Sequence, residues 1–274
     1  MLTEIRKHCA DLLTRKQVAA VYGLRERDGH TAPYLFTRAE DLDGLTVGTK
    51  VPVTFTLRPA KKNIISAFQE KCPGQKIAVL VRGCDERGLY EVAKRGQIQV
   101  ADLAIIGYAC DADQARACHC PRPHPQNLKF GEKVQGPSNE AFIAKIVNMS
   151  VAEREAFWRA QFSKCIKCYG CRNSCPVCIC KECWMENDAF SPTGWLPPDF
   201  PMFHFVHFYH LSDSCIECGA CVDACPMDIP LNLIRKVLSK KVQEELFYTA
   251  GQDPEEKPPL ASREEAKERL EKGI

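Results

Sequence analysis

Two runs of cysteine with the same spacing stand in the C-terminal half of the chain and could bind iron–sulfur clusters. The first reads Cys165-x2-Cys168-x2-Cys171-x3-Cys175-Pro176, and the second Cys215-x2-Cys218-x2-Cys221-x3-Cys225-Pro226. Gaps of two residues let successive thiolates reach neighbouring irons of one cubane, and in paired sites the cysteine before proline ligates the other cluster. The spacing therefore predicts two [4Fe–4S] clusters with exchanged ligands. One would use Cys165, Cys168, Cys171 and Cys225, and the other Cys215, Cys218, Cys221 and Cys175.

A zinc site and a disulfide framework are the alternatives. Zinc sites typically draw on separated ligand pairs and carry no such continuous run. The chain has 17 cysteines among 274 residues, opens MLTEIRKHC without a signal-peptide core, and contains no stretch of transmembrane length. These features favour metal-binding thiols in a reducing cytoplasm and predict no membrane span. Because exposed clusters are usually oxygen-sensitive, we also expect an anaerobic host.

The overall charge excludes one class of partner. With 37 basic and 35 acidic residues the chain is nearly neutral. Bulk electrostatics therefore favours neither nucleic acid nor an anionic membrane surface.

The elements around these runs predict an α/β domain followed by an α+β ferredoxin-like dicluster domain with an insertion. Hydrophobic periodicity indicates alternating helices and strands in the N-terminal part, which is typical of an α/β unit. The expected domains are an α/β unit over residues 1–120, a linker over 121–149, a dicluster domain over 150–249 with an insertion at 177–211, and a polar tail over 250–274. The expected helices are 4–16, 63–71 and 86–95, and the expected strands are 17–24, 34–37, 51–57, 77–81 and 103–107.

Further cysteines follow the last two of these strands. Cys84 and Cys110 each stand just after a strand, and Cys118-His119-Cys120-Pro121 comes soon afterwards. Ligands of open α/β sheets bind where strands end. We therefore predict a third cluster on Cys84, Cys110, Cys118 and Cys120, the alternative being free cysteines buried as small hydrophobic residues.

The N-terminal motifs also resemble a known family. Arg82-Gly83-Cys84-Asp85 and Ile105-Ile106-Gly107-x2-Cys110 are similar to two loops of the coenzyme F420 hydrogenase/dehydrogenase beta-subunit family, although the first lacks that family's proline. The resemblance covers about residues 10–120. It implies an iron–sulfur flavoprotein that relays electrons between FAD and clusters within formate dehydrogenase, hydrogenase or heterodisulfide-reductase complexes. The family places flavin contacts near residues 46–50, which otherwise read as a polar turn.

The insertion carries two more groups of potential ligands. Cys178, Cys180 and Cys183 follow the first run directly and could complete a further cluster with an N-terminal cysteine, replace Cys118 and Cys120 as ligands, or be redox-silent thiols. His204, His207 and His210 recur at helical spacing among aromatic residues. Such a face could bind haem or a metal, or could be a packing surface.

The function expected from these residues is electron transfer within a complex. No pair of acid and base residues marks a substrate pocket, so we expect the catalytic site to lie on another redox subunit. One alternative is an enzyme whose FAD takes hydride from reduced F420 or NAD(P)H and passes single electrons to the clusters. The other is a scaffold that docks the ferredoxin module, with Cys84 and Cys110 dispensable.

Overall fold

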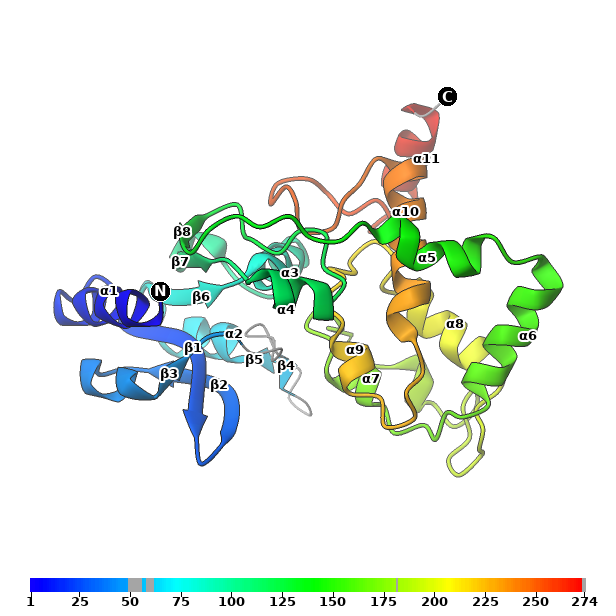
Figure 1. Cartoon of the computed structure of the whole chain (residues 1–274), viewed down its shortest axis with the longest axis horizontal. Coiled ribbons are helices and arrows are strands. Elements are labelled where there is room, and N and C mark those ends of the chain that lie inside the picture. The colour runs from blue at the N-terminus through cyan, green and yellow to red at the C-terminus, as the bar shows by residue number, and fades with distance from the viewer. Residues whose placement is uncertain (49–55, 58–61, 181, 273–274) are drawn as a thin grey trace. The chain divides into compact units, whose positions relative to one another are not determined.

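The chain folds into two compact units, which we describe separately. The computed structural model describes residues 1–48, 56–57, 62–180 and 182–272. The first unit is Met1–Pro137 and the second is Ser138–Ile274 (Figure 1). The boundary lies inside the stretch that we expected to be a linker.

A mixed β-sheet organises the first unit. Its strands run in the order β2-β1-β6-β7-β8, and β3 also pairs with β1. The pairs β1–β6, β6–β7 and β7–β8 are parallel, whereas β2 and β3 are antiparallel to β1. The strands are β1 (Ala20–Arg27), β2 (His30–Phe36), β3 (Leu45–Thr46), β6 (Ile77–Val81), β7 (Leu103–Tyr108) and β8 (Leu128–Phe130), with a separate pair β4 (Thr56–Leu57) and β5 (Lys62–Asn63).

The parallel strands at the centre of the sheet are explained by their apolar composition. All five residues of β6 are buried and apolar, as is typical of strands covered on both faces. One core cluster joins helix α1 to the sheet through Ile5, Val21 and Ile106. The helices of this unit are α1 (Leu2–Thr14), α2 (Ile64–Lys71), α3 (Gly83–Lys94) and α4 (Ala112–Ala117), with 3-10 turns η1 (Ala39–Gly44) and η2 (Val100–Asp102).

Most predicted elements of this unit are present within a few residues. The strand expected over 77–81 coincides with β6, and the helix expected over 63–71 with α2. The strands expected over 17–24 and 34–37 form a longer hairpin, because Asp28 and Gly29 turn the chain with positive φ. Of the strand expected over 51–57, residues 51–55 lie outside the described residues.

The expected linker, residues 121–149, contains secondary structure instead. Strand β8 joins the sheet edge, and Glu86 on α3 accepts hydrogen bonds from the backbone N–H groups of Gln126 and Asn127. Helix α5 (Asn139–Val147) packs with α10 (Leu231–Leu246) in the second unit. Backbone pairing and the apolar helix α5 hold this stretch to its neighbours. Neither feature has a strong sequence signal, which is why the stretch was predicted to be a linker.

Helices and loops make up the described part of the second unit. No described residue between 138 and 274 lies in a strand, so the α+β class expected for this part is not seen. The cysteine runs instead alternate short loops with single-turn helices. Besides α5 and α10, the elements are α6 (Val151–Phe162), α7 (Gly170–Asn173), η3 (Trp184–Glu186), α8 (Met202–Tyr209), α9 (Ala220–Asp223) and α11 (Arg263–Lys272).

Two further features of the second unit match the sequence. Ser150 and Glu153 form the predicted capping box of α6, with both backbone N–H groups bonded to the opposite side chain. The expected polar tail forms α11, where Arg269 pairs with Glu256 and Glu265. Among the helices described, none combines the length and the apolar character that crossing a bilayer would need.

Candidate iron–sulfur sites

The two cysteine runs fold into loops of the same conformation. Lys167 and Glu217, at matching positions, have φ of 51° and 58°, and Tyr169 and Gly219, which precede α7 and α9, have φ of 58° and 80°. These left-handed residues turn each loop back on itself. Helices α7 and α9 lie side by side, and Ser174 Oγ donates a hydrogen bond to the carbonyl of Ala220 at 3.1 Å. The repeated sequence therefore gives a repeated structure.

A first cavity is lined by Cys165, Cys168, Cys171 and Cys225. It encloses about 490 Å³, counting the part open to solvent. Three of its cysteines come from the first run and one from the second, which is the exchanged set expected from the spacing. The insertion supplies much of the remaining wall, namely Met185, Phe203, His204 and His207.

A second cavity is lined by Cys215, Cys218, Cys221 and Cys175. It encloses about 460 Å³ on the same measure. This is the complementary exchanged set. Helix α10 forms its wall with Asn232, Arg235 and Lys236. Lys236 is 1% exposed and pairs with Glu217 at 3.0 Å, so a buried ion pair holds this loop against α10.

In both cavities the cysteine thiols lie in apolar, buried surroundings, which affects their pKa values. Burial raises the pKa of Cys171 to about 12 and that of Cys221 to about 11. The guanidinium of Arg235 opposes the rise at both thiols and at Cys175. Thiols of such high pKa are protonated at neutral pH unless a metal replaces the proton, so binding of a cluster here would release protons.

Each cavity is lined by four cysteines, the number that a cubane requires. No three His, Cys, Asp or Glu side chains converge as ligands of one metal ion within the part of the chain that the structure describes. The four thiolates around a cubane each bind a different iron and stand farther apart than the ligands of one ion. Backbone donors are also present, since the N–H of Gly170 lies 3.5 Å from the Sγ of Cys168.

A third group of cysteines lies at the carboxyl ends of β6 and β7. Cys84 opens α3 after β6, Cys110 follows β7, and Cys118 and Cys120 follow α4. Cys120 raises the pKa of both Cys84 and Cys110, and Cys118 raises that of Cys110, although burial is the largest cause and brings both pKa values to about 12. Cys110 therefore lies near Cys118 and Cys120, and Cys84 lies near Cys120.

Two glycines make this approach possible. A Cβ on Gly83 would lie 2.6 Å from the carbonyl oxygens of Arg122 and His124, and one on Gly107 would overlap the carbonyl of Asn127. The loop that follows Cys120 thus packs directly on both strand ends. Arg82 and Arg87, 3% and 5% exposed, place positive charge beside the thiols, and Arg87 Nη2 lies 3.8 Å from Cys120 Sγ.

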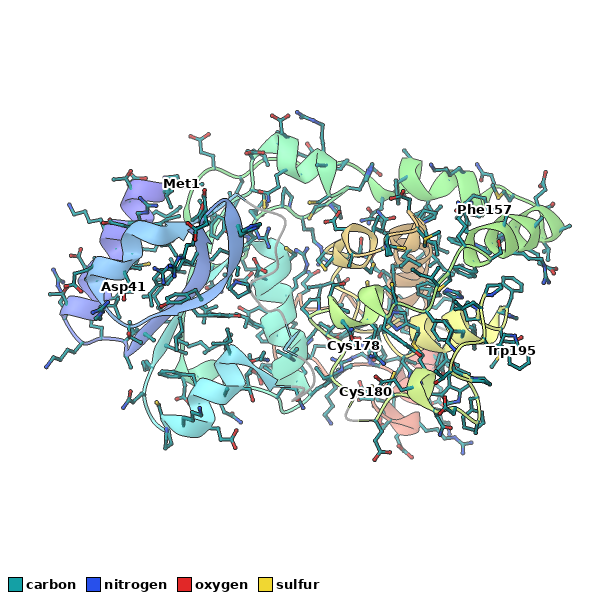
Figure 2. All side chains as sticks on the ribbon, turned by 90° about the horizontal axis from the view of Figure 1, so that it is seen from below. Met1, Asp41, Phe157, Cys178, Cys180 and Trp195 are labelled. Carbon is teal, nitrogen blue, oxygen red and sulfur yellow. The ribbon has the colours of Figure 1, made fainter. Side chains whose placement is uncertain are left out.

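The three cysteines of the insertion occupy different environments. Cys178 is buried and raises the pKa of Cys175, so it lies next to the second cavity. Cys180 is exposed, and both are labelled in Figure 2 on the stretch that follows α7. Cys183 interacts with the guanidinium of Arg172, which also pairs with Glu186 at 2.7 Å. A ligand role for Cys178, Cys180 and Cys183 stays a prediction.

The three histidines of the insertion also differ in burial. His204 and His207 are each 4% exposed and line the first cavity, whereas His210 is exposed at the end of α8. The packing interpretation describes His204 well, because its ring stacks on Phe162 with centroids 3.9 Å apart.

Sequence reasoning missed Arg235, which the structure places beside thiols of both cavities. A signal was present, because Arg235 is four residues from Leu231 and three from Leu238 and so falls on the apolar stripe of α10. An arginine on such a buried stripe marks a site that needs positive charge.

Comparisons with known proteins bear on the second cysteine run and on the chain as a whole. Residues 208–230, which contain the second cysteine run, match the 4Fe-4S binding domain family. The chain is 45% identical over 147 residues to the F420-dependent formate dehydrogenase subunit beta of Methanocaldococcus jannaschii. It is 39% identical over 153 residues to the F420-dependent formate dehydrogenase 1 subunit beta of Methanococcus maripaludis. These matches cover 52% and 55% of the chain but only 38% and 39% of the relatives, so the chain spans about two fifths of their length. It therefore contains a segment that matches the 4Fe-4S binding domain family, and about half of it resembles part of the beta subunits of F420-dependent formate dehydrogenases.

Proposed function

We propose that this chain is an iron–sulfur electron-transfer subunit of a larger oxidoreductase complex. The observation that carries the proposal is the pair of cavities, each lined by three cysteines of one run and the fourth of the other. When bound, a [4Fe–4S] cluster accepts and releases one electron at a time. Two such sites joined by exchanged ligands would provide adjacent steps for an electron.

The protein's own residues would set the conditions for this transfer. The exchanged cysteines fix the distance between the two sites, and the packing of α7 against α9 keeps it constant. The insertion covers the first site with Met185 and Phe203, which exclude water. Arg235 and Lys236 supply positive charge at the second site, where thiolate ligands gather negative charge.

A third cluster in the first unit extends the proposal. Cys84, Cys110, Cys118 and Cys120 would hold it, supported by the mutual effects of their thiols and by the two buried arginines. Both arginines also have partners within the first unit, since Arg82 pairs with Asp85 at 2.8 Å and Arg87 donates to the carbonyl of Arg122 at 3.1 Å. Iron content, rather than these arginines, would therefore distinguish a cluster site from a first unit that serves only as a docking scaffold.

The partners follow from the named relatives. They are beta subunits of formate dehydrogenases, so we propose that this chain works with another subunit that oxidises or produces formate. That subunit would hold the substrate site, and this chain would carry the electrons. An anaerobic cytoplasmic setting would suit exposed clusters.

A second candidate function is favoured by the same names, because both relatives are F420-dependent. The chain would then bind FAD in its first unit and take up hydride from reduced F420 or NAD(P)H. Of the segment 46–50, residues 49 and 50 lie outside the described residues, and Thr46 pairs with Leu24 as part of β3. FAD stays a prediction from the resemblance.

Anaerobic purification followed by measurement of iron, acid-labile sulfide and released flavin per chain tests these proposals. About eight irons without flavin would support a two-cluster relay, and about twelve would add the site in the first unit. One flavin per chain would favour the hydride-accepting enzyme. A folded chain without sulfide would contradict the proposed function.

A further inference from the structure

Two buried histidines form part of the wall of the first cavity. His204 and His207 stand three residues apart on α8 and therefore lie on the same face of the helix. The opposite face carries Phe205 and Tyr209, which are 55% and 56% exposed. The helix thus turns its two imidazole rings, rather than its exposed aromatic rings, toward Cys165, Cys168, Cys171 and Cys225.

The positions of both histidines are fixed by their surroundings. His204 stacks on Phe162 with an interplanar angle of 6°, and Phe203 meets it edge-on with centroids 5.2 Å apart. The backbone carbonyls of His207 and Phe208 accept hydrogen bonds from Arg235 at 3.5 Å and 3.2 Å. The ring of His204 is thus held by its aromatic neighbours, and the backbone of His207 is held by Arg235.

Each ring also has a buried nitrogen that lacks a protein partner. His204 Nδ1 and His207 Nε2 have no hydrogen bond among the described residues. Leaving a buried polar group unsatisfied costs about 1 to 3 kcal/mol, and such groups are rare in native structures. An imidazole always carries at least one N–H, so each ring can donate a hydrogen bond to an acceptor placed in the cavity.

We propose that His207, with His204 beside it, donates a ring N–H hydrogen bond to sulfur at the iron–sulfur cluster held by the first cavity. This inference rests on the proposed function, because the acceptors are the sulfides and cysteine thiolates of that cluster. A donor to sulfur stabilises the more negative, reduced state and so raises the reduction potential. Among the described residues that line the second cavity there is no histidine. The two clusters would therefore differ in potential, and the insertion that distinguishes this chain from a simple ferredoxin would set the difference.

The test compares three variants by redox titration followed by EPR in the whole chain. His207→Phe keeps a planar ring but removes the donor, and His207→Gln keeps a side-chain N–H. His210→Phe is the matched control, because His210 is exposed and caps the C-terminus of the same helix. The signal of the first cluster is assigned beforehand with Cys168→Ser, which alters a ligand of that site alone.

We expect His207→Phe to lower the equilibrium constant for reduction of the first cluster about tenfold, which is the effect of one hydrogen bond to a charged group. For a one-electron reduction this lowers the reduction potential by about 59 mV. The second cluster should keep its potential. His207→Gln should restore most of the loss, and His210→Phe should leave both potentials unchanged. Unchanged potentials in His207→Phe with full iron content would overturn the inference, whereas a parent chain that lacks sulfide would instead contradict the proposed function.

A measurement on the unaltered protein decides the matter if His207→Phe fails to retain iron. Pulsed EPR of reduced protein labelled with ¹⁵N-histidine should detect a weak nitrogen coupling and an exchangeable proton at the first cluster. No histidine coupling would overturn the inference. A strong coupling would also overturn it, because it would identify histidine as a direct iron ligand.

Discussion

Arg235 shows how one side chain can serve two sites. It is 4% exposed, lies over the ring of Phe208 at 4.6 Å, and donates hydrogen bonds to backbone carbonyls of α8. It opposes the effect of burial on the pKa of Cys171, which lines the first cavity, and of Cys175 and Cys221, which line the second. A fixed positive charge shared in this way should stabilise the reduced state of both clusters.

Replacing Arg235 with leucine should therefore lower both reduction potentials. A charge several ångströms away, at an effective dielectric constant near 20, is worth on the order of 2 kcal/mol. Arg235→Lys, which keeps the charge, should lose less. Redox titration followed by EPR measures both clusters in one experiment. A shift at only one cluster, or an equal loss in the lysine variant, would show that hydrogen bonding rather than charge is what matters.

The pair of cluster loops depends on close backbone packing at Gly170. A Cβ at this position would lie 2.5 Å from the carbonyl oxygen of Ala224, on the neighbouring loop. That oxygen belongs to the backbone and cannot rotate away. The equivalent residue of the second run is Ala220, so the two halves of the repeat are not interchangeable here.

Gly170→Ala should destabilise the second unit by about 1 to 3 kcal/mol, the usual cost of overpacking. Gly219→Asn is the matched control. Gly219 has positive φ and nothing within 4 Å of an added Cβ, and asparagine tolerates this conformation. Thermal unfolding under anaerobic conditions compares the two variants. Equal losses of stability in both would mean that the loops can move apart to admit the methyl group.

The elements differ in how far their sequences predict them. Strand β6 and helix α2 were predicted because a run of apolar residues or a helical period marks them locally. The grouping of three cysteines of one run with the fourth of the other around each cavity was also predictable, since it follows from cysteine spacing. The sequence did not predict the histidine-lined wall of the first cavity. That wall forms because Tyr169 Oη and Lys167 Nζ bind the carbonyls of Met185 and Pro192, contacts between segments with no common pattern. Strand β8 was missed for a similar reason, as its three residues gain their place only by pairing with β7.

Across the whole molecule, some buried cysteines are proposed cluster ligands and others are ordinary core residues. Cys9 on α1 is fully buried in the core, and burial raises its pKa to about 12. Its thiol is as buried as those of the proposed ligands, yet the charged group that acts on its pKa is Lys129, whereas cysteines act on the pKa values of Cys84 and Cys110. Burial and pKa alone therefore do not identify a ligand, and convergence with other thiols is the feature that separates Cys84 and Cys110 from Cys9.

This distinction predicts how iron is divided between the units. Replacing Cys84 and Cys110 together with alanine should remove about four of about twelve irons per chain and leave the EPR signals of the two C-terminal clusters in place. Cys9→Ala should keep all the iron, at a cost of roughly 1 kcal/mol in stability. Iron and sulfide analysis of both variants gives the count. If the double variant keeps its full iron content, the first unit holds no cluster on these residues, and its thiols and arginines would need another explanation. If it loses four irons while the other signals persist, electrons can be carried in both units of the chain.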